Sequence, residues 1–248
     1  MSKHYEAHDR YEGHDDYYYG YNGSVDSDGF AHQKADLSHH EVRGDDGYRN
    51  AIEGSAGDDL IAGGGKDDVL SGGLGSDVIS AGAGNDIVIG GGSRDTGINR
   101  IDGGSGDDIL VAGGQKTSAF SALFAANPLL NTLVHADAKF ADVADIIDGT
   151  SSTPGTLFGA LGMASTPVEN DFIIHSGNGN DLILNFHAAT DKIVVDRVLN
   201  GVTIDSASLL QHMVVNGSNV TIDLGQGNSV TLVGVDPAGL SAANFVVV

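Results

Sequence analysis

Acidic side chains recur at a nine-residue spacing, interrupted once, and each closes a glycine-rich stretch of the chain. They are Asp59, Asp68, Asp77, Asp86 and Asp108, with the amide Asn99 in one place of the series and Asp181 in a separate later copy. A repeated turn stacks such side chains in columns, where carboxylates without a countercharge repel one another. A hard cation such as calcium (Ca2+) takes six to eight oxygen ligands, which aspartates and turn carbonyls supply. The spacing therefore predicts several Ca2+ ions bound between stacked turns.

The stretches that carry these acids are copies of one nine-residue repeat. Four copies follow one another at 54–62, 63–71, 72–80 and 81–89, and a fifth at 103–111 follows an expanded turn of thirteen residues. Glycine permits positive φ and a close approach of two backbones, so the glycines that open the turns belong to the predicted metal sites. These openers are Gly54, Gly63, Gly72, Gly90 and Gly103.

Three residues at the end of each copy are expected to be extended, and only the middle side chain then points inward. The inward residues are Ile52, Ile61, Leu70, Ile79, Val88, Ile101 and Leu110. One apolar residue in nine makes a thin core. A disordered acidic linker would explain the composition but not the apolar residue two places after each acid, so the pattern favours a stacked solenoid.

At these residues the chain resembles the RTX family, whose GGxGxDxUx nonapeptides build a calcium-loaded β-roll. The resemblance implies a mainly β fold: a right-handed parallel β-roll with short helical insertions and a β-rich cap toward the carboxyl end. The copies depart from the family pattern in places. Lys66 stands where the fourth glycine belongs, Ser55 and Ala81 replace other glycines, and Asn99 replaces an aspartate.

Composition and residue pattern divide the sequence into four regions. Residues 1–43 form an arm rich in histidine and tyrosine, since residues 1–40 contain six of the ten histidines and six of the seven tyrosines. The roll is expected over 44–114, and 115–170 read as helical or irregular insertions between its turns, with helices within 115–144. The last roll turns, the cap and a secretion signal are expected in 171–248.

The cap is expected to consist of strands joined by tight turns. A strand is expected over 209–215, and alternating apolar residues predict strands over 220–224 and 230–233, with turns between them at 216–218 and 225–228. The final stretch, 234–248, is similar to the uncleaved carboxy-terminal signals of type I secretion substrates. The amino terminus lacks the apolar core of a cleaved secretory signal. We therefore expect an extracellular or cell-surface protein that a type I secretion transporter exports.

Composition excludes several classes of partner. A formal net charge of −22, from 34 acidic and 12 basic residues, disfavours nucleic acid and anionic membrane surfaces. No run of 18 apolar residues predicts insertion into a membrane. The chain has no cysteine, which excludes disulfides and thiolate metal sites. Divalent cations are the natural counterions.

No catalytic motif accompanies the repeats. The sequence has no HExxH helix, no GxSxG elbow, no cysteine nucleophile and no phosphate-binding loop, so we expect no enzyme. Paired acids such as Asp58 and Asp59 recur in further copies, at 67–68 and 107–108, which favours cation ligands over a glycosidase pair. The favoured hypothesis is a structural protein that polymerises with itself, head to tail, into a filament, surface layer or biofilm matrix. The alternatives are a soluble calcium- or carbohydrate-binding effector, with exopolysaccharide as a candidate partner, and a small RTX enzyme.

Overall fold

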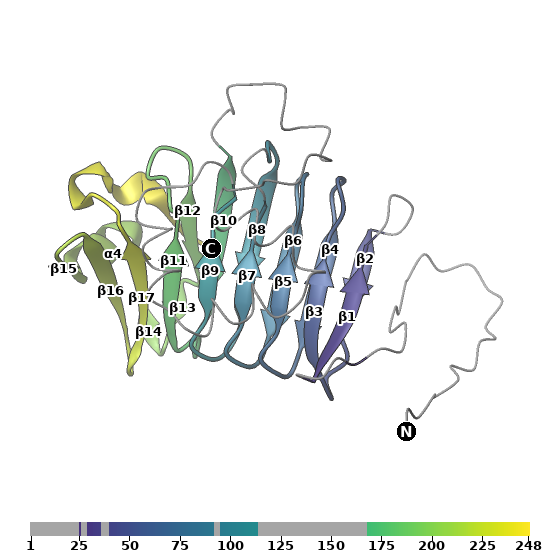
Figure 1. Cartoon of the computed structure of the whole chain (residues 1–248). Helices are drawn as coiled ribbons and strands as arrows, with labels where there is room; N and C mark the ends of the chain where they lie inside the picture. Colours follow the sequence, from purple (N-terminus) through teal and green to yellow (C-terminus); the bar gives the residue numbers. More distant parts are fainter. Residues whose placement is uncertain (1–24, 26–28, 36–39, 92–94, 114–167) are drawn as a thin grey trace.

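The computed structural model describes residue 25 and residues 29–35, 40–91, 95–113 and 168–248. Over these residues the chain consists mainly of β-strands in two long sheets that lie one behind the other (Figure 1). Both sheets are parallel over most of their width. The mainly β prediction and the parallel β-roll are confirmed.

The first sheet has nine strands. In spatial order they are β1 (Phe30–Lys34), β3 (Arg49–Glu53), β5 (Val69–Ser71), β7 (Ile87–Ile89), β9 (Ile109–Val111), β11 (Asn180–Leu184), β17 (Asn228–Val233), β16 (Asn219–Gly225) and β15 (Met213–Asn216). The second sheet has seven strands. They are β18 (Phe245–Val247), β12 (Lys192–Val195), β10 (Glu169–Ile174), β8 (Ile98–Asp102), β6 (Val78–Gly82), β4 (Leu60–Gly64) and β2 (Glu41–Arg43).

Successive strands of the repeats alternate between the two sheets, so two nine-residue repeats make one turn of the roll. Leu70 lies beside Val88, eighteen residues later, in a parallel pair. Across the expanded turn Val88 lies beside Leu110, twenty-two residues later, and the register of the apolar residues is unchanged. The four extra residues are therefore accommodated in a loop and leave the strands in place.

The core lies between the sheets and is one side chain thick per strand. All seven residues that we predicted to point inward are at most 1% exposed. Toward the carboxyl end the core widens with larger side chains, and the rings of Phe172 and Phe186 lie 6.0 Å apart between centroids. The thin repeat core thus merges with a broader one under the cap.

Both sheets continue across the long gap in the described chain. β8 pairs with β10 and β9 pairs with β11, although more than seventy residues separate the paired positions in sequence. The helices that we predicted within 115–144 lie outside the described residues. The expected insertion 115–170 ends slightly earlier than predicted, because β10 begins at Glu169 and already belongs to the roll.

The roll begins earlier than we predicted. β1 pairs in parallel with β3, and β2 pairs with β4, so residues assigned to the arm 1–43 form the first strands. These strands lack the glycine pattern, and contacts distant in sequence hold them instead. The guanidinium carbon of Arg49 lies 4.0 Å from the centroid of the Phe30 ring. Residues 1–24 of the predicted arm lie outside the described residues.

The cap contains a helix that we did not predict. α4 (Ser206–Gln211) occupies the beginning of the segment expected as a strand over 209–215, because Asp205 accepts hydrogen bonds from the backbone N–H groups of Ala207 and Ser208 and so caps the helix. β15, β16 and β17 follow as an antiparallel meander. A short antiparallel pair, β13 (Val198–Leu199) and β14 (Val202–Thr203), precedes the helix.

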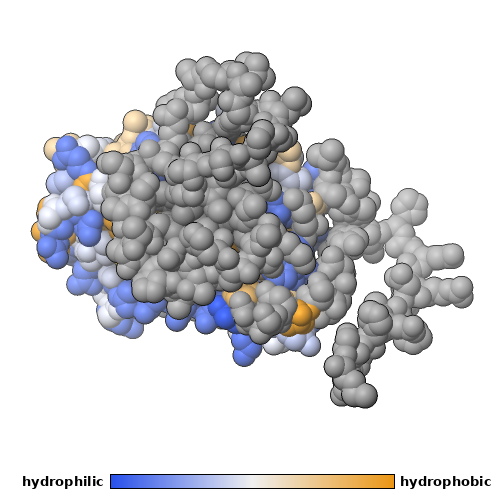
Figure 2. All heavy atoms as spheres, viewed as in Figure 1, coloured by the Kyte–Doolittle hydropathy of each residue, from blue (hydrophilic) through white to orange (hydrophobic). Residues whose placement is uncertain are grey.

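The end of the sequence is part of the fold. It forms two short 3-10 helices, η2 (Pro237–Gly239) and η3 (Ala242–Asn244), and then β18, which pairs with β12. Phe245 is buried in the core. Figure 2 shows hydrophilic residues over much of the described surface around β15 and β16. None of the helices in the described part of the chain is long and apolar enough to cross a membrane.

Candidate metal centre

The repeated acids and amides form two buried columns, one along each sheet. Along the nine-stranded sheet the column contains Asn50, Asp68, Asp86, Asp108 and Asp181, and along the seven-stranded sheet it contains Asp59, Asp77, Asn99, Asn170 and Asp191. Each of these side chains is almost completely buried. The structure therefore brings the predicted acids and Asn99 together in two rows, and it adds Asn50, Asn170 and Asp191, which the sequence analysis did not include.

In seven of the ten column members the backbone of the preceding turn donates a hydrogen bond to one side-chain oxygen. The N–H of Asp59 donates to Asp77 Oδ1 at 3.0 Å, and the N–H of Asp68 donates to Asp86 Oδ1 at 2.7 Å. The same bond recurs from Asn50 to Asp68, from Asp77 to Asn99, from Asp86 to Asp108, from Asp108 to Asp181 and from Asn170 to Asp191. Each turn therefore positions the carboxylate of the next.

The second oxygen has no partner in four of the carboxylates. Oδ2 of Asp68, Asp77, Asp86 and Asp108 is buried and accepts no hydrogen bond. A buried carboxylate oxygen without a partner costs free energy, because it has lost its water and gained nothing in return. These four oxygens need a donor or a cation.

The turn glycines stand next to these oxygens. A Cβ added to Gly72 would collide with Asp77 Oδ2 and with the carbonyl oxygen of Gly90. A Cβ on Gly63 would collide in the same way with Asp68 Oδ2 and the Ala81 carbonyl. Glycine is required here because carboxylate and carbonyl oxygens of neighbouring turns converge around its Cα. Gly103 has the same relation to Asp108 Oδ2, and Gly54 lies against the Gly72 carbonyl and Asp59 Oδ2.

Burial makes these carboxylates poor anions in the absence of a cation. Desolvation raises the pKa from the ordinary 3.8 to about 6 in Asp68 and Asp108, to about 7 in Asp77 and Asp181, and to about 8 in Asp86. The backbone hydrogen bond to each carboxylate lowers the pKa, and neighbouring aspartates raise it. For Asp86 these neighbours are Asp108 and Asp68. The folded turn therefore favours a proton or a metal ion on these groups.

Asp59 and Asp181, toward the ends of the columns, find partners within the protein. Asp59 Oδ2 accepts from the N–H of Ser55 at 2.6 Å, and Asp59 Oδ1 lies 3.0 Å from the ring nitrogen Nδ1 of His40. Asp181 Oδ2 accepts from the side-chain amide of Asn178 at 3.2 Å. The demand for a cation is therefore concentrated in the four central acids.

The expanded turn contains an acid that the sequence reasoning missed. Asp95 is completely buried, and its Oδ2 accepts from the side-chain amide of Asn99 at 2.6 Å. Asn99, predicted as a ligand, thus donates through Nδ2 while its Oδ1 takes the column bond from Asp77. Asp95 follows Gly90 by five residues, the same interval as from Gly54 to Asp59, and this interval could have identified it.

Gly90, which we predicted in a metal site, has no carboxylate beside it, whereas its neighbour Gly91 has one. A Cβ on Gly90 would meet the side chains of Ile101 and Asn170 and the backbone nitrogen of Gly113, with no carboxylate among its nearest atoms. A Cβ on Gly91 would instead collide with Asp95 Oδ2. Gly91 therefore has the place beside a carboxylate that we predicted for Gly90.

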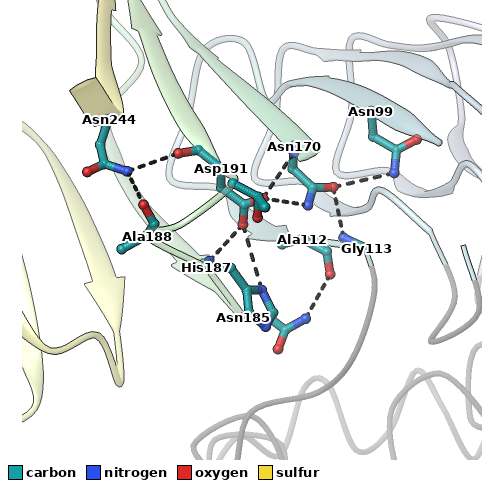
Figure 3. A network of polar contacts seen from close by, with 10 residues as sticks. Asn99, Ala112, Gly113, Asn170, Asn185, His187, Ala188, Asp191 and Asn244 are labelled. Atoms are coloured by element: carbon teal, nitrogen blue, oxygen red, sulfur yellow. Dashed lines mark hydrogen bonds and ion pairs between the residues drawn. The ribbon is translucent and has the colours of Figure 1, made fainter. Parts of the chain in front are cut away.

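Beyond the expanded turn, amide and backbone N–H groups supply hydrogen bonds to both carboxylate oxygens of the column member Asp191 (Figure 3). Asn170 donates its backbone N–H and its side-chain amide to Asp191 Oδ1, both at 3.0 Å, and Asp191 Oδ2 accepts from the N–H of His187 at 2.8 Å. Asn170 Oδ1 accepts from the N–H of Gly113 at 3.0 Å. The Asn244 amide donates to the carbonyl oxygens of Ala188 and Asp191. Burial still raises the pKa of Asp191, while these hydrogen bonds lower it.

The central turns fit Ca2+ by the chemistry of their oxygens. Within the described residues no point gathers three or more His, Asp or Glu side chains. The groups that meet around Gly63 and Gly72 are instead mixed, a carboxylate oxygen with backbone carbonyl oxygens. Ca2+ prefers such hard oxygen ligands and accepts carbonyls beside carboxylates. Asp68, Asp77, Asp86 and Asp108 would hold the ions, and the ions would supply the missing countercharge.

A parallel β-roll whose turns present buried carboxylates to a hard cation defines a calcium-binding repeat structure. Residues 45–79, 63–97 and 95–116 match the family described as RTX calcium-binding nonapeptide repeat (4 copies), so this part of the chain consists of RTX repeats. No curated protein matches the chain. Among solved structures, it is similar to the crystal structure of extracellular lipase LipA from Serratia marcescens, with 16% sequence identity and a TM-score of 0.36. The match covers 88% of this chain and 42% of the lipase chain.

Proposed function

We propose that this protein is exported unfolded, folds outside the cell when its central turns bind Ca2+, and then assembles with itself. The observation that carries the proposal is the set of four buried carboxylate oxygens without a partner, on Asp68, Asp77, Asp86 and Asp108. Extracellular calcium modules work at about 10⁻⁴ to 10⁻³ M, far above the free calcium of a cytosol. The roll is therefore unstable before export and stable after it.

A calcium titration followed by far-UV circular dichroism tests the folding step. We expect the central repeat turns to be largely unfolded in chelator at about pH 8, with a cooperative gain of β-signal as calcium rises to about 10 mM. Magnesium is the matched control and should act poorly, since it demands a smaller octahedral shell. A spectrum that is the same in chelator and in calcium would overturn the proposal.

Export by a type I transporter is the second element. Residues 234–248, which are similar to the signals of such substrates, include buried Phe245 and the edge strand β18. A transporter would therefore have to recognise this segment before the chain folds. Removing residues 234–248 should abolish release from cells that carry the matching transporter. Release of the truncated chain at the normal level would show that the signal lies elsewhere.

Self-assembly is the third element, and edge strands support it. The edge strands of the nine-stranded sheet are β1 and β15, and those of the seven-stranded sheet are β2 and β18. Val214 and Val215 of β15 are exposed. An exposed apolar edge strand is a template for pairing with another chain. Bound Ca2+ would also offset much of the net charge of −22, which otherwise keeps copies apart. A head-to-tail contact that does not close on itself would propagate as a filament.

Light scattering in calcium tests assembly. The full-length chain should form high-mass species in calcium and none in chelator, and Val214→Lys should reduce them. Removing residues 1–24 tests the arm without disturbing β1 and β2. A full-length chain that stays monomeric in calcium at high concentration would refute self-assembly and favour the soluble calcium- or carbohydrate-binding effector. We propose no catalytic activity for either role.

A further inference from the structure

Asn–Gly dipeptides are positions where a side chain can react with its own backbone. The backbone nitrogen of the glycine lies within reach of the asparagine carbon Cγ, and glycine has no Cβ to hinder the approach. The sequence contains four such dipeptides, at 22–23, 178–179, 200–201 and 216–217. The last three belong to the described residues. The structure holds two of these three asparagines firmly and leaves the third free.

Asn178 is held at each atom that the reaction uses. Its Oδ1 accepts from the N–H of His175 at 2.6 Å, and its Nδ2 donates to Asp181 Oδ2 at 3.2 Å. The backbone nitrogen of Gly179, which would have to attack Cγ, donates to Asn228 Oδ1 at 2.9 Å. The side chain and the attacking nitrogen are therefore both engaged as long as the roll is folded.

Asn200 is held in a similar way between three loops. Its Oδ1 accepts from the N–H of Gly177 at 3.0 Å, and its Nδ2 donates to the carbonyl oxygen of Leu224 at 3.0 Å. Its backbone N–H donates to Ser176 Oγ at 2.8 Å, and the residue is only 7% exposed. A rotation of this side chain toward Gly201 would break the first two bonds, so the fold opposes it.

Asn216 has none of these restraints. It is the last residue of β15, it pairs with Asn219 of β16, and Gly217 and Ser218 form the exposed turn between them. Within the described part of the chain, neither the Asn216 amide nor the Gly217 N–H has a hydrogen-bond partner. Gly217 has a φ of +64°, and a Cβ added there would meet nothing within 4 Å. The reacting atoms thus have room to move.

We propose that Asn216 is a site of spontaneous deamidation, through which the protein modifies its own edge strand β15. The Gly217 nitrogen attacks Cγ of Asn216. The N–Cγ bond forms, the Cγ–Nδ2 bond breaks, and Nδ2 leaves as ammonia with the proton that the Gly217 nitrogen loses. The resulting cyclic imide takes up one water molecule. It opens either to aspartate or to isoaspartate, in which the main chain runs through the former side chain. Water is the only co-reactant.

Both products alter the edge of the nine-stranded sheet. Aspartate adds a negative charge next to the exposed Val214 and Val215. Isoaspartate adds a backbone carbon at the residue that pairs with Asn219, beside the turn that sets the register of the hairpin. β15 has a neighbouring strand on one side only, so no second partner holds it in place. The effect on assembly rests on the proposed function: where copies pair through β15, the contact weakens as the protein ages.

Peptide mass mapping of the full-length protein tests the modification. After incubation in calcium at mildly alkaline pH, Asn216 should be converted at least about tenfold faster than Asn178 or Asn200, because these two react only after local opening. In urea with chelator, where the fold is lost, the three asparagines should react at similar rates. Two results would overturn the proposal: equal rates in the folded protein, or an intact Asn216 under conditions where the unfolded chain reacts.

Two variants test the consequence for the edge strand. Asn216→Gln keeps an amide but disfavours the cyclic imide, and Asn216→Asp copies one product. Hydrogen exchange should show that β15 loses protection in aged natural protein and keeps it in aged Asn216→Gln. Full protection of β15 in deamidated protein would refute the effect on the edge. Light scattering of the same samples separates the two proposals. If fresh protein does not assemble in calcium, the proposed function fails while the modification stands, and equal assembly of fresh protein and Asn216→Asp would refute the effect of the added charge.

Discussion

The central turns and the carboxy-terminal turns of the roll differ in how the carboxylate oxygens of their columns find hydrogen-bond partners. Around Asp68, Asp77, Asp86 and Asp108 one carboxylate oxygen per residue is buried without a partner. Around Asn170 and Asp191 amides and backbone N–H groups donate to both oxygens of the aspartate. The carboxylates of the central turns therefore need a cation or another donor, whereas Asp191 already has hydrogen-bond donors within the chain.

The difference shows how a single change of residue type sets the need for a metal. An asparagine in the column accepts through Oδ1 as an aspartate does, but its Nδ2 also donates, as Asn99 does to Asp95 and Asn170 to Asp191. Such a turn carries its own donor. Calcium dependence should therefore be graded along the roll, strongest where aspartates follow one another and weakest at the amide network.

The largest expected effect is a pH dependence of the central turns in chelator. Their pKa values of about 6 to 8 lie above the ordinary 3.8, so the calcium-free folded state binds more protons than the unfolded state between these values. The free energy of unfolding should then fall as pH rises from about 5 to 8. The amount of β-structure in chelator, followed by far-UV circular dichroism between these pH values, measures it. With calcium the trend should reverse, since protons compete with the ion, and equal stability at both pH values in chelator would contradict the assignment.

The next effect is expected in the amide network. Asp191→Ala leaves the two Asn170 donors and the His187 N–H buried without an acceptor. Each lost partner of a buried donor is costly, so the loss should be about 3 kcal/mol in the free energy of unfolding. It should be the same with and without calcium. A loss that appears only in calcium would mean that Asp191 is a metal ligand.

A smaller effect, opposite in sign in the two conditions, is expected at the centre of the roll. Asp86→Asn keeps an acceptor for the Asp68 N–H but removes a buried charge between Asp68 and Asp108. In chelator it should stabilise the roll by about 1 kcal/mol, while the calcium midpoint should rise about tenfold or more. Asp67→Asn, at an exposed position, is the control and should shift the midpoint less. Loss of stability in both conditions would refute the role of Asp86.

The smallest effect is expected on the outer surface. The partly exposed ion pair between Lys192 and Glu169 lies on the seven-stranded sheet, at the residues next to Asp191 and Asn170 in sequence. Lys192→Met should lower the free energy of unfolding by about 0.5 kcal/mol or less, and the loss should disappear in about 1 M salt. Thermal unfolding at two salt concentrations measures it. A change in the calcium midpoint would show that this surface is coupled to the metal sites.

The repeat itself could be predicted from the sequence because its information is local and redundant. One apolar residue and one acid in each nine fix the strand, the inward face and the register, and the seven predicted core residues are all buried. The burial of Asp59, Asp68, Asp77, Asp86, Asp108 and Asp181 follows from the same period.

Features that depend on contacts distant in sequence could not be predicted in this way. β1 carries no repeat signal and is held by pairing with β3 and by Arg49 against Phe30. The side-chain amide of Asn99 donates to Asn170 Oδ1, 71 residues later, so the repeat spacing could not predict that Asn170 belongs to the column. α4 takes the first residues of the strand that we expected over 209–215, because Asp205 caps a helix there, and the strand β15 begins only at Met213.

Hydrogen exchange of the full-length protein at decreasing calcium tests the central claim most directly. The backbone amides of Asp59, Asp68 and Asp86 donate to column carboxylates in the central turns, and the amides of Asn170 and His187 donate to Asp191. We predict that the first set loses protection at a higher calcium concentration than the second. Simultaneous loss in both regions, or earlier loss around Asp191, would contradict the account.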